Sequence, residues 1–134
     1  MTDKETAIQE QERILVVDDE ASIRRILETR LKMVGYEVIT AADGEEALEA
    51  FQKHNPDLII LDVMMPKING YKISRLLKYD NKYKDIPIIM VTARSQLEDK
   101  AIGEETGVNE YITKPFELDQ IVKKVEEYIG ASES

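Results

Sequence analysis

The stretch DLIILDVMMP, residues 57–66, places one acidic residue inside an otherwise apolar run. Residues 58–61 are all apolar, and residues 63–65 continue the run beyond Asp62. Burying a carboxylate costs free energy unless it is paired, binds a metal or reaches the rim of the protein. We therefore expect residues 58–61 to form a buried strand whose mouth is marked by Asp62, with residues 63–65 as the loop beyond it.

Four other short apolar runs are predicted to be strands: residues 13–17, 36–40, 87–91 and 110–112. Apolar residues at helical spacing predict the helices between and after them: 23–34, 44–54, 70–81, 96–106 and 118–129. Strands that are apolar throughout indicate burial on both faces of a parallel sheet. Right-handed crossovers then give a doubly wound α/β fold in three layers, for which the flavodoxin-like strand order 2-1-3-4-5 is expected.

The chain has 134 residues, no cysteine and a net charge of -9. Its length suits one domain, which we place at residues 13–130, with residues 1–12 as a flexible tail and residues 131–134 as a tail or the start of a linker. The negative charge argues against direct binding of nucleic acid or of anionic membrane. Neither a bilayer-spanning run nor a signal-peptide pattern is found, and the composition fits a cytoplasmic protein.

Polar residues end four of the predicted strands, and the carboxyl ends of parallel strands share one edge of the sheet. These residues are Asp18 and Asp19 after the first strand, Asp62 after the third, Thr92 after the fourth and Lys114 after the fifth. Taken singly, each has a plain structural explanation: an Asp pair often caps a helix, a Thr ends a strand, and Lys-Pro forms a turn. The functional interpretation therefore rests on their joint occurrence.

Three carboxylates in one cleft repel one another, and a hard divalent cation relieves that repulsion. Mg²⁺ prefers oxygen ligands and often completes its shell with phosphate oxygens. Together with the Lys114 ammonium and the Thr92 hydroxyl, such a cation would make a site for a transferred phosphoryl group. Asp62 would then be the nucleophile, giving an aspartyl phosphate.

The chain resembles the receiver domains of two-component response regulators from about residue 13 to residue 130. The matching motifs are ILVVDDE at 14–20, DLIILDVMMPKINGYK at 57–72, PIIMVTA at 87–93 and YITKPF at 111–116. The resemblance implies a signalling switch that catalyses its own phosphorylation and dephosphorylation. It further implies that a sensor histidine kinase or a histidine phosphotransfer protein donates the phosphoryl group.

Site roles follow from the resemblance position by position. Asp62 matches the phosphoacceptor. Asp19 matches the direct Mg²⁺ ligand, Asp18 the acid that acts through water, and Met64 the residue whose backbone carbonyl binds the metal. Mn²⁺ is a possible substitute for Mg²⁺. The residues that match the phosphoryl-oxygen ligands are Thr92 and Lys114. The resemblance also implies a small residue at Ala93 and a cis Lys114-Pro115 bond.

The switch implied by the resemblance couples Thr92 to Tyr111, the aromatic residue of the fifth strand. The output face would be the helix at 96–106, the fifth strand and the last helix, acting on an output domain or a protein partner. Charge pairs on this face support dimers in the winged-helix transcription-factor class, and Lys100, Glu105, Glu110 and Lys124 keep part of that pattern. Asn109 and Gln120 replace acids, so a phosphorylation-dependent homodimer is expected to be poorly supported.

Three other functions fit the sequence less well. A phosphatase of the haloacid dehalogenase type needs a second acid two residues after its nucleophile, where this chain has Met64. A flavodoxin-like cofactor binder would need a phosphate cradle where the chain reads DDEAS, and a degenerate receiver would lack site residues that are all present. His54, the one histidine, is expected at the surface and far from the site. Whether the chain acts alone or belongs to a longer protein stays open.

Overall fold

The computed structural model describes residues 11–65, 67–93 and 107–130. Its sheet has five parallel strands in the order β2-β1-β3-β4-β5, as the sequence predicted. The strands are β1 (Arg13–Val17), β2 (Glu37–Ala41), β3 (Leu58–Asp62), β4 (Ile88–Ala93) and β5 (Glu110–Lys114). The change of direction in strand order lies between β1 and β3, where ligand sites of such folds are found.

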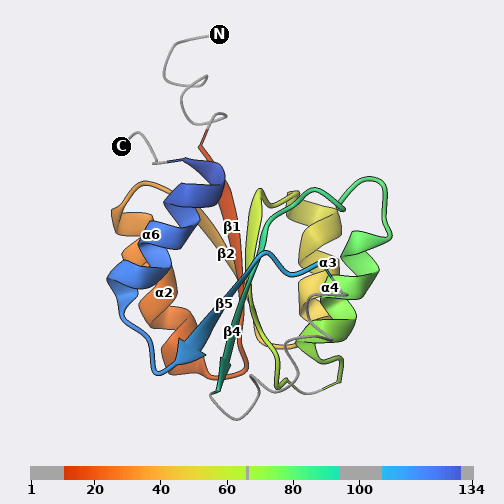
Figure 1. The fold of residues 1–134 in the computed structure, drawn as a ribbon, viewed down its shortest axis with the longest axis horizontal. Coiled ribbons are helices and arrows are strands. Elements are labelled where there is room, and N and C mark those ends of the chain that lie inside the picture. The colour runs from red at the N-terminus through yellow and green to blue at the C-terminus, as the bar shows by residue number, and fades with distance from the viewer. Residues whose placement is uncertain (1–10, 66, 94–106, 131–134) are drawn as a thin grey trace, which may run out of the picture.

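The described residues contain four helices: α2 (Ala21–Met33), α3 (Gly44–His54), α4 (Gly70–Lys78) and α6 (Leu118–Ile129). Helices α2 and α6 cover one face of the sheet, and α3 and α4 cover the other, which gives the predicted three layers (Figure 1). The helix expected at residues 96–106 lies outside the described residues. None of the helices in the described part of the chain has the length and apolar character that crossing a bilayer would require.

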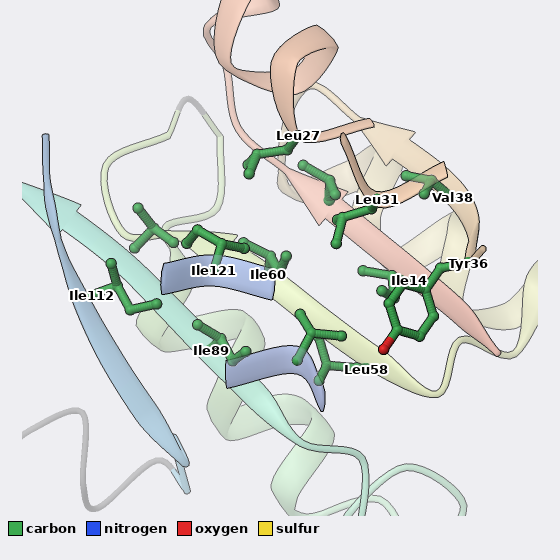
Figure 2. Packing of buried hydrophobic residues seen from close by; sticks show 13 residues of the cluster. Ile14, Leu27, Leu31, Tyr36, Val38, Leu58, Ile60, Ile89, Ile112 and Ile121 are labelled. Carbon is green, nitrogen blue, oxygen red and sulfur yellow. The ribbon is translucent and has the colours of Figure 1, made fainter. Parts of the chain in front are cut away.

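Two hydrophobic clusters explain why the strands are apolar at every position. In β1, Ile14 and Val16 face the α2–α6 side, while Leu15 and Val17 face the α3–α4 side. On the first side, Ile60, Ile89 and Ile112 of successive strands extend the same layer (Figure 2). Each strand therefore contributes to both clusters, because successive side chains point to opposite faces.

Strands β3, β4 and β5 run further than expected at their carboxyl ends, and their extra residues are polar or small. Strand β3 includes Asp62, β4 includes Thr92 and Ala93, and β5 includes Thr113 and Lys114. The sheet register continues through these positions, with Asp62 opposite Val91 and Ala93 opposite Lys114. Backbone pairing in the sheet thus fixes the positions of Asp62, Thr92 and Lys114.

Both ends of the described domain are held at the turn between α2 and β2. The Gln11 side chain donates to the carbonyl oxygen of Gly35 at 2.7 Å. The hydroxyl of Tyr36, a buried residue visible in Figure 2, donates to the carbonyl oxygen of Gly130 at 2.8 Å, just beyond the end of α6. This turn lies at the amino edge of the sheet, since β2 begins at Glu37.

Candidate functional site

Three carboxylates meet at the carboxyl edge of the sheet, where the strand order changes direction. One oxygen from each of Asp18, Asp19 and Asp62 lies within 4.8 Å of the others. Asp18 and Asp62 are only 3% and 6% exposed, whereas Asp19 is exposed. The convergence predicted from the strand ends is therefore confirmed for these three residues.

The loop after β1 is shaped by hydrogen bonds to Asp18. Its Oδ1 accepts the backbone N–H of Glu20 at 2.9 Å, and its carbonyl oxygen accepts from the Arg24 guanidinium at 2.6 Å. Helix α2 has Glu20 as its N-cap residue. The Asp18–Asp19 pair is therefore not the N-cap of this helix, and the structural explanation that the sequence left open does not hold.

Lys114 brings a positive charge from the end of β5 to the carboxylates. Its Nζ lies 2.9 Å from Asp18 Oδ2 and 3.5 Å from Asp62 Oδ2, and also 3.5 Å from Glu20 Oε1. Burial alone would lower the pKa of Lys114, but the hydrogen bond to Asp18 and the charges of Asp62, Asp18 and Glu20 outweigh it and raise that pKa. The following Lys114-Pro115 peptide bond is cis, as expected.

The environment of Asp62 opposes its ionisation. Burial, followed by the negative charge of Asp18, raises the pKa of the Asp62 carboxyl to about 6. Lys114 and the Met64 N–H, which donates to Asp62 Oδ1 at 3.3 Å, act in the opposite direction without cancelling the effect. The sheet therefore holds a carboxylate whose negative charge is only partly compensated.

Two further residues of the predicted site, Thr92 and Tyr111, lie on β4 and β5. Thr92 is fully buried at the end of β4, opposite Thr113 of β5, and its hydroxyl donates to the carbonyl oxygen of Ala93 at 3.4 Å. Tyr111 is partly buried in β5, three residues before Lys114, and packs against the hydrophobic cluster on the α3–α4 side of the sheet. The structure therefore places Thr92 at the carboxyl edge of the sheet and Tyr111 further back in β5, opposite Met90 of β4, and the roles of both stay predictions.

The donor set suits a hard divalent cation. All three converging side chains offer carboxylate oxygens, and Met64 lies in the adjoining loop, two residues after Asp62. Mg²⁺ takes oxygen ligands of this type and keeps several waters. A cation would also relieve the repulsion between Asp18 and Asp62 that raises the Asp62 pKa.

A groove of about 670 Å³ opens beside Lys114, between α2 and the loop that enters α6. Its apolar lining includes Ile23 and Ile26 of α2 with Phe116 and Leu118 from the other side. The Ile26 side chain is 46% exposed, although it is large and apolar. The carboxylate cluster thus adjoins an open, partly apolar surface.

Sequence reasoning missed two neighbours of the site, Glu20 and Arg24. Glu20 approaches Lys114, and Arg24 fixes the carbonyl of Asp18. The motif DDEASIR contains both residues, but nothing in their spacing reveals how the loop after β1 turns them. His54, by contrast, lies at the end of α3, away from the carboxylates, as predicted.

Comparison with known proteins defines the class. The sequence model described as "Response regulator receiver domain" matches residues 14–126. This chain is therefore a member of the response regulator receiver family, a signalling switch of two-component systems.

Particular relatives are similar over nearly the whole chain. It is 52% identical to "Probable transcriptional regulator ycf27" of Cyanophora paradoxa (91% of this chain, 50% of the relative), and 44% identical to "Alkaline phosphatase synthesis transcriptional regulatory protein PhoP" of Bacillus subtilis (90% and 50%). The response regulator TrrA of Thermotoga maritima, solved in complex with Mg(2+)-BeF, matches with a TM-score of 0.78 at 41% identity (88% of this chain, 99% of that one). The chain spans about half the length of the curated relatives it matches.

Proposed function

We propose that the domain accepts a phosphoryl group on Asp62 and that Mg²⁺ assists the transfer. The single observation that carries this is the buried Asp62 carboxylate, held with two other carboxylates and one ammonium at the carboxyl edge of the sheet. Asp19 and Asp62 would bind the cation directly, Asp18 through water and Met64 through its carbonyl oxygen. Mn²⁺ offers similar oxygen affinity and would substitute.

The transfer needs one bond to form and one to break. A carboxylate oxygen of Asp62 attacks the phosphorus atom, and the bond between phosphorus and the donor's imidazole nitrogen breaks, leaving its electron pair on that nitrogen. A cation held by the carboxylates would supply positive charge for the phosphoryl oxygens. The Lys114 ammonium, 3.5 Å from Asp62 Oδ2, would turn toward the phosphoryl oxygens. The Thr92 hydroxyl would give up its long hydrogen bond to the Ala93 carbonyl and donate to a phosphoryl oxygen instead.

The donor would be a sensor histidine kinase or a histidine phosphotransfer protein. The groove beside Lys114 offers an apolar surface next to the reacting carboxylate, through which such a protein could reach it. Two relatives are named as transcriptional regulators and are about twice as long as the matched part, so we propose an output domain or protein as the downstream partner. The cytoplasm, where such partners act, is the proposed location.

The output signal would pass through Thr92 and Tyr111 toward the face of β5 and α6. On that face, Lys124 Nζ lies 3.4 Å from Glu110 Oε2 within the same chain. This pair is therefore already satisfied without a second copy, and Asn109 uses its side-chain oxygen to accept the Ile88 N–H at 2.9 Å. Among the described residues, the Lys124–Glu110 pair therefore offers less to a phosphorylation-dependent homodimer on this face, and sedimentation with and without beryllium fluoride tests for one.

The direct test is incubation with Mg²⁺ and acetyl phosphate, followed by intact-protein mass spectrometry and amide NMR with beryllium fluoride. We expect one added phosphoryl group and shifts centred on Asp62, Thr92 and Lys114. Asp62→Asn should abolish both. Asp57→Asn is the matched control, because Asp57 precedes the same strand at the opposite edge of the sheet and is exposed. An unmodified wild type, or undiminished modification of Asp62→Asn, would overturn the proposal.

A further inference from the structure

The loop between β3 and α4 returns to the strand from which it leaves. The Gly70 N–H donates to the carbonyl oxygen of Val63 at 2.9 Å, and a Cβ added at Gly70 would collide with the carbonyl oxygen of Asp62. At the start of the loop, the Met64 N–H donates to Asp62 Oδ1 at 3.3 Å. The base of the loop is therefore closed directly against the backbone of Asp62.

The far side of the same loop rests on the first turn of α3. Lys67 Nζ lies 3.4 Å from Asp43 Oδ2 and 3.3 Å from Glu45 Oε2. A Cβ added at Gly44 would lie 2.5 Å from the Cβ and 2.7 Å from the carbonyl oxygen of Ile68, so only glycine permits this approach. We call this contact the loop anchor; it consists of Asp43, Gly44, Glu45, Lys67 and Ile68.

Lys67 occupies its place in spite of an unfavourable backbone. Its φ is 70°, in the left-handed region that side chains other than glycine, asparagine and aspartate rarely adopt. Glycine at this position would remove the conformational strain but also both ion pairs. Asp43, which Lys67 contacts, also caps α3 by accepting the Glu46 N–H at 2.9 Å. Lys67 therefore joins the loop to a helix end whose backbone is itself fixed.

We propose that the loop anchor is a positioning device for the metal site. By holding the far side of the loop, it would set where residues 63–65 present the Met64 carbonyl beside Asp62, and hence how tightly Mg²⁺ binds. This inference rests on the proposed function, since it takes the carboxylate cluster as the Mg²⁺ site. Lys67 is a positioning residue, because its ion pairs are with α3 and not with the carboxylates of the cluster.

Electrostatics alone predicts the opposite effect of removing Lys67. The chain already carries a net charge of -9, and removing a positive charge makes it more negative, which strengthens its attraction for a cation. If the anchor positions the loop, Lys67→Gln weakens Mg²⁺ binding in spite of that attraction. The sign of the change in affinity therefore separates positioning from a general charge effect.

The first experiment is an Mg²⁺ titration of the unphosphorylated full chain, followed by amide NMR. We expect Lys67→Gln to raise the dissociation constant about two- to fivefold, the range that loss of partly exposed ion pairs gives. Lys67→Arg should leave the dissociation constant at the wild-type value, because arginine can keep the ion pairs. Lys72→Gln is the matched control: it removes the same charge from an exposed side chain in the first turn of α4 and should leave binding equal or slightly tighter.

The second experiment displaces the loop from the other side of the anchor. Alanine is favoured over glycine within a helix, so Gly44→Ala should be benign unless its new Cβ pushes Ile68 away. We expect weaker Mg²⁺ binding and, in metal-free protein, faster hydrogen exchange of the Gly70 amide that donates to Val63. The exchange measurement needs no bound metal and so reports on the loop itself.

The outcomes separate this inference from the proposed function. A wild type that binds Mg²⁺ and is phosphorylated on Asp62, with unchanged affinity in Lys67→Gln and unchanged Gly70 exchange in Gly44→Ala, would overturn the positioning role alone. Tighter binding in Lys67→Gln, as in Lys72→Gln, would also overturn it. A wild type that neither binds Mg²⁺ nor is modified on Asp62 would instead overturn the proposed function.

Discussion

Asp62 combines two properties that stability alone would not select: it is buried, and it stands beside another carboxylate. Both disfavour its charged form, and its pKa rises from the ordinary value of 3.8 to about 6. Near neutral pH the metal-free protein must therefore hold an ionised group that the unfolded chain would hold at lower free energy. A cation bound to these carboxylates would lower the free-energy cost of keeping Asp62 ionised in the folded state.

Replacing Asp62 by Asn should stabilise the metal-free protein near pH 7. The folded state binds the Asp62 proton more tightly than the unfolded state, so the free energy of unfolding of the wild type falls as the pH rises from about 4 to 6. Above that range the full penalty applies, about 1 to 3 kcal/mol at ~1.4 kcal/mol per pKa unit. Urea unfolding in EDTA should show the gain for Asp62→Asn at pH 7.5 and little of it at pH 4.

Asp57→Asn serves as the control for this effect, since it removes an exposed carboxylate just before the same strand. It should show no comparable gain at pH 7.5. Saturating Mg²⁺ should stabilise the wild type more than Asp62→Asn, because only the wild type keeps the full ligand set. A destabilised Asp62→Asn at pH 7.5 in EDTA would contradict the assigned cause.

At this scale the sequence predicted the residues at or just beyond the strand ends and missed the contacts that the path of the chain from β1 into α2 creates. Asp18, Asp62 and Lys114 could be placed together because parallel strands share one carboxyl edge. The contact of Glu20 with Lys114 and that of Arg24 with Asp18 depend on the path of the loop after β1. No residue periodicity encodes such a path, so the sequence alone does not predict these contacts.

Helix α4 begins at a side-chain cap that also ends the β3–α4 loop. The Asn69 side chain accepts the Lys72 N–H at 3.0 Å, which satisfies one of the donors left free in a first helical turn. The helix ends at Lys78, three residues earlier than the periodicity indicated, and a series of turns follows. In the stretch KYDNKYK, residues 78–84, Asp80 and Asn81 favour turns over helix, and the Asp80 side chain accepts the Lys82 N–H at 2.8 Å.

Loss of this cap should destabilise the domain by a modest amount. Asn69→Ala removes the acceptor and should lower the free energy of unfolding by about 0.5 to 2 kcal/mol. Asn69→Asp keeps an acceptor and should lose much less. Chemical denaturation followed by circular dichroism measures both changes.

Asn81→Ala makes the same substitution at an exposed position in the turns after α4. It should change stability by less than about 0.5 kcal/mol. Equal losses at the two positions would show that the cap hydrogen bond contributes nothing specific.

The two hydrophobic clusters lie on opposite faces of the same sheet and are linked through its strands. Every strand supplies residues to both clusters. Unfolding of one cluster therefore also disturbs the sheet against which the other cluster packs. Strand order and layering were predictable, because unbroken apolar strands and alternating helices leave few arrangements. The division of each strand between the two clusters followed from the alternation of side chains.

Adjacent leucines of α4 provide a test of this cooperative core. Leu77 is 3% exposed and packs against the sheet, whereas Leu76 is 47% exposed. Leu77→Ala should cost about 2 to 5 kcal/mol through lost packing and a cavity. Leu76→Ala removes the same atoms from the surface and should cost less than about 0.5 kcal/mol.

Near-ultraviolet and far-ultraviolet circular dichroism should follow one transition in Leu77→Ala, because both faces of the sheet unfold together. Separate transitions for the two signals would show that the α3–α4 face unfolds by itself.

The hydrogen bonds of Gln11 and Tyr36 hold both ends of the domain to one turn, at the edge of the sheet away from the carboxylates. Five-residue strands at ~3.3 Å per residue set the two edges about 16 Å apart. A fluorophore or fusion partner joined beyond Gln11 or Gly130 would therefore start from a fixed point that leaves the reacting edge open. Such labels could follow encounters of the domain with other proteins without obstructing the chemistry they report.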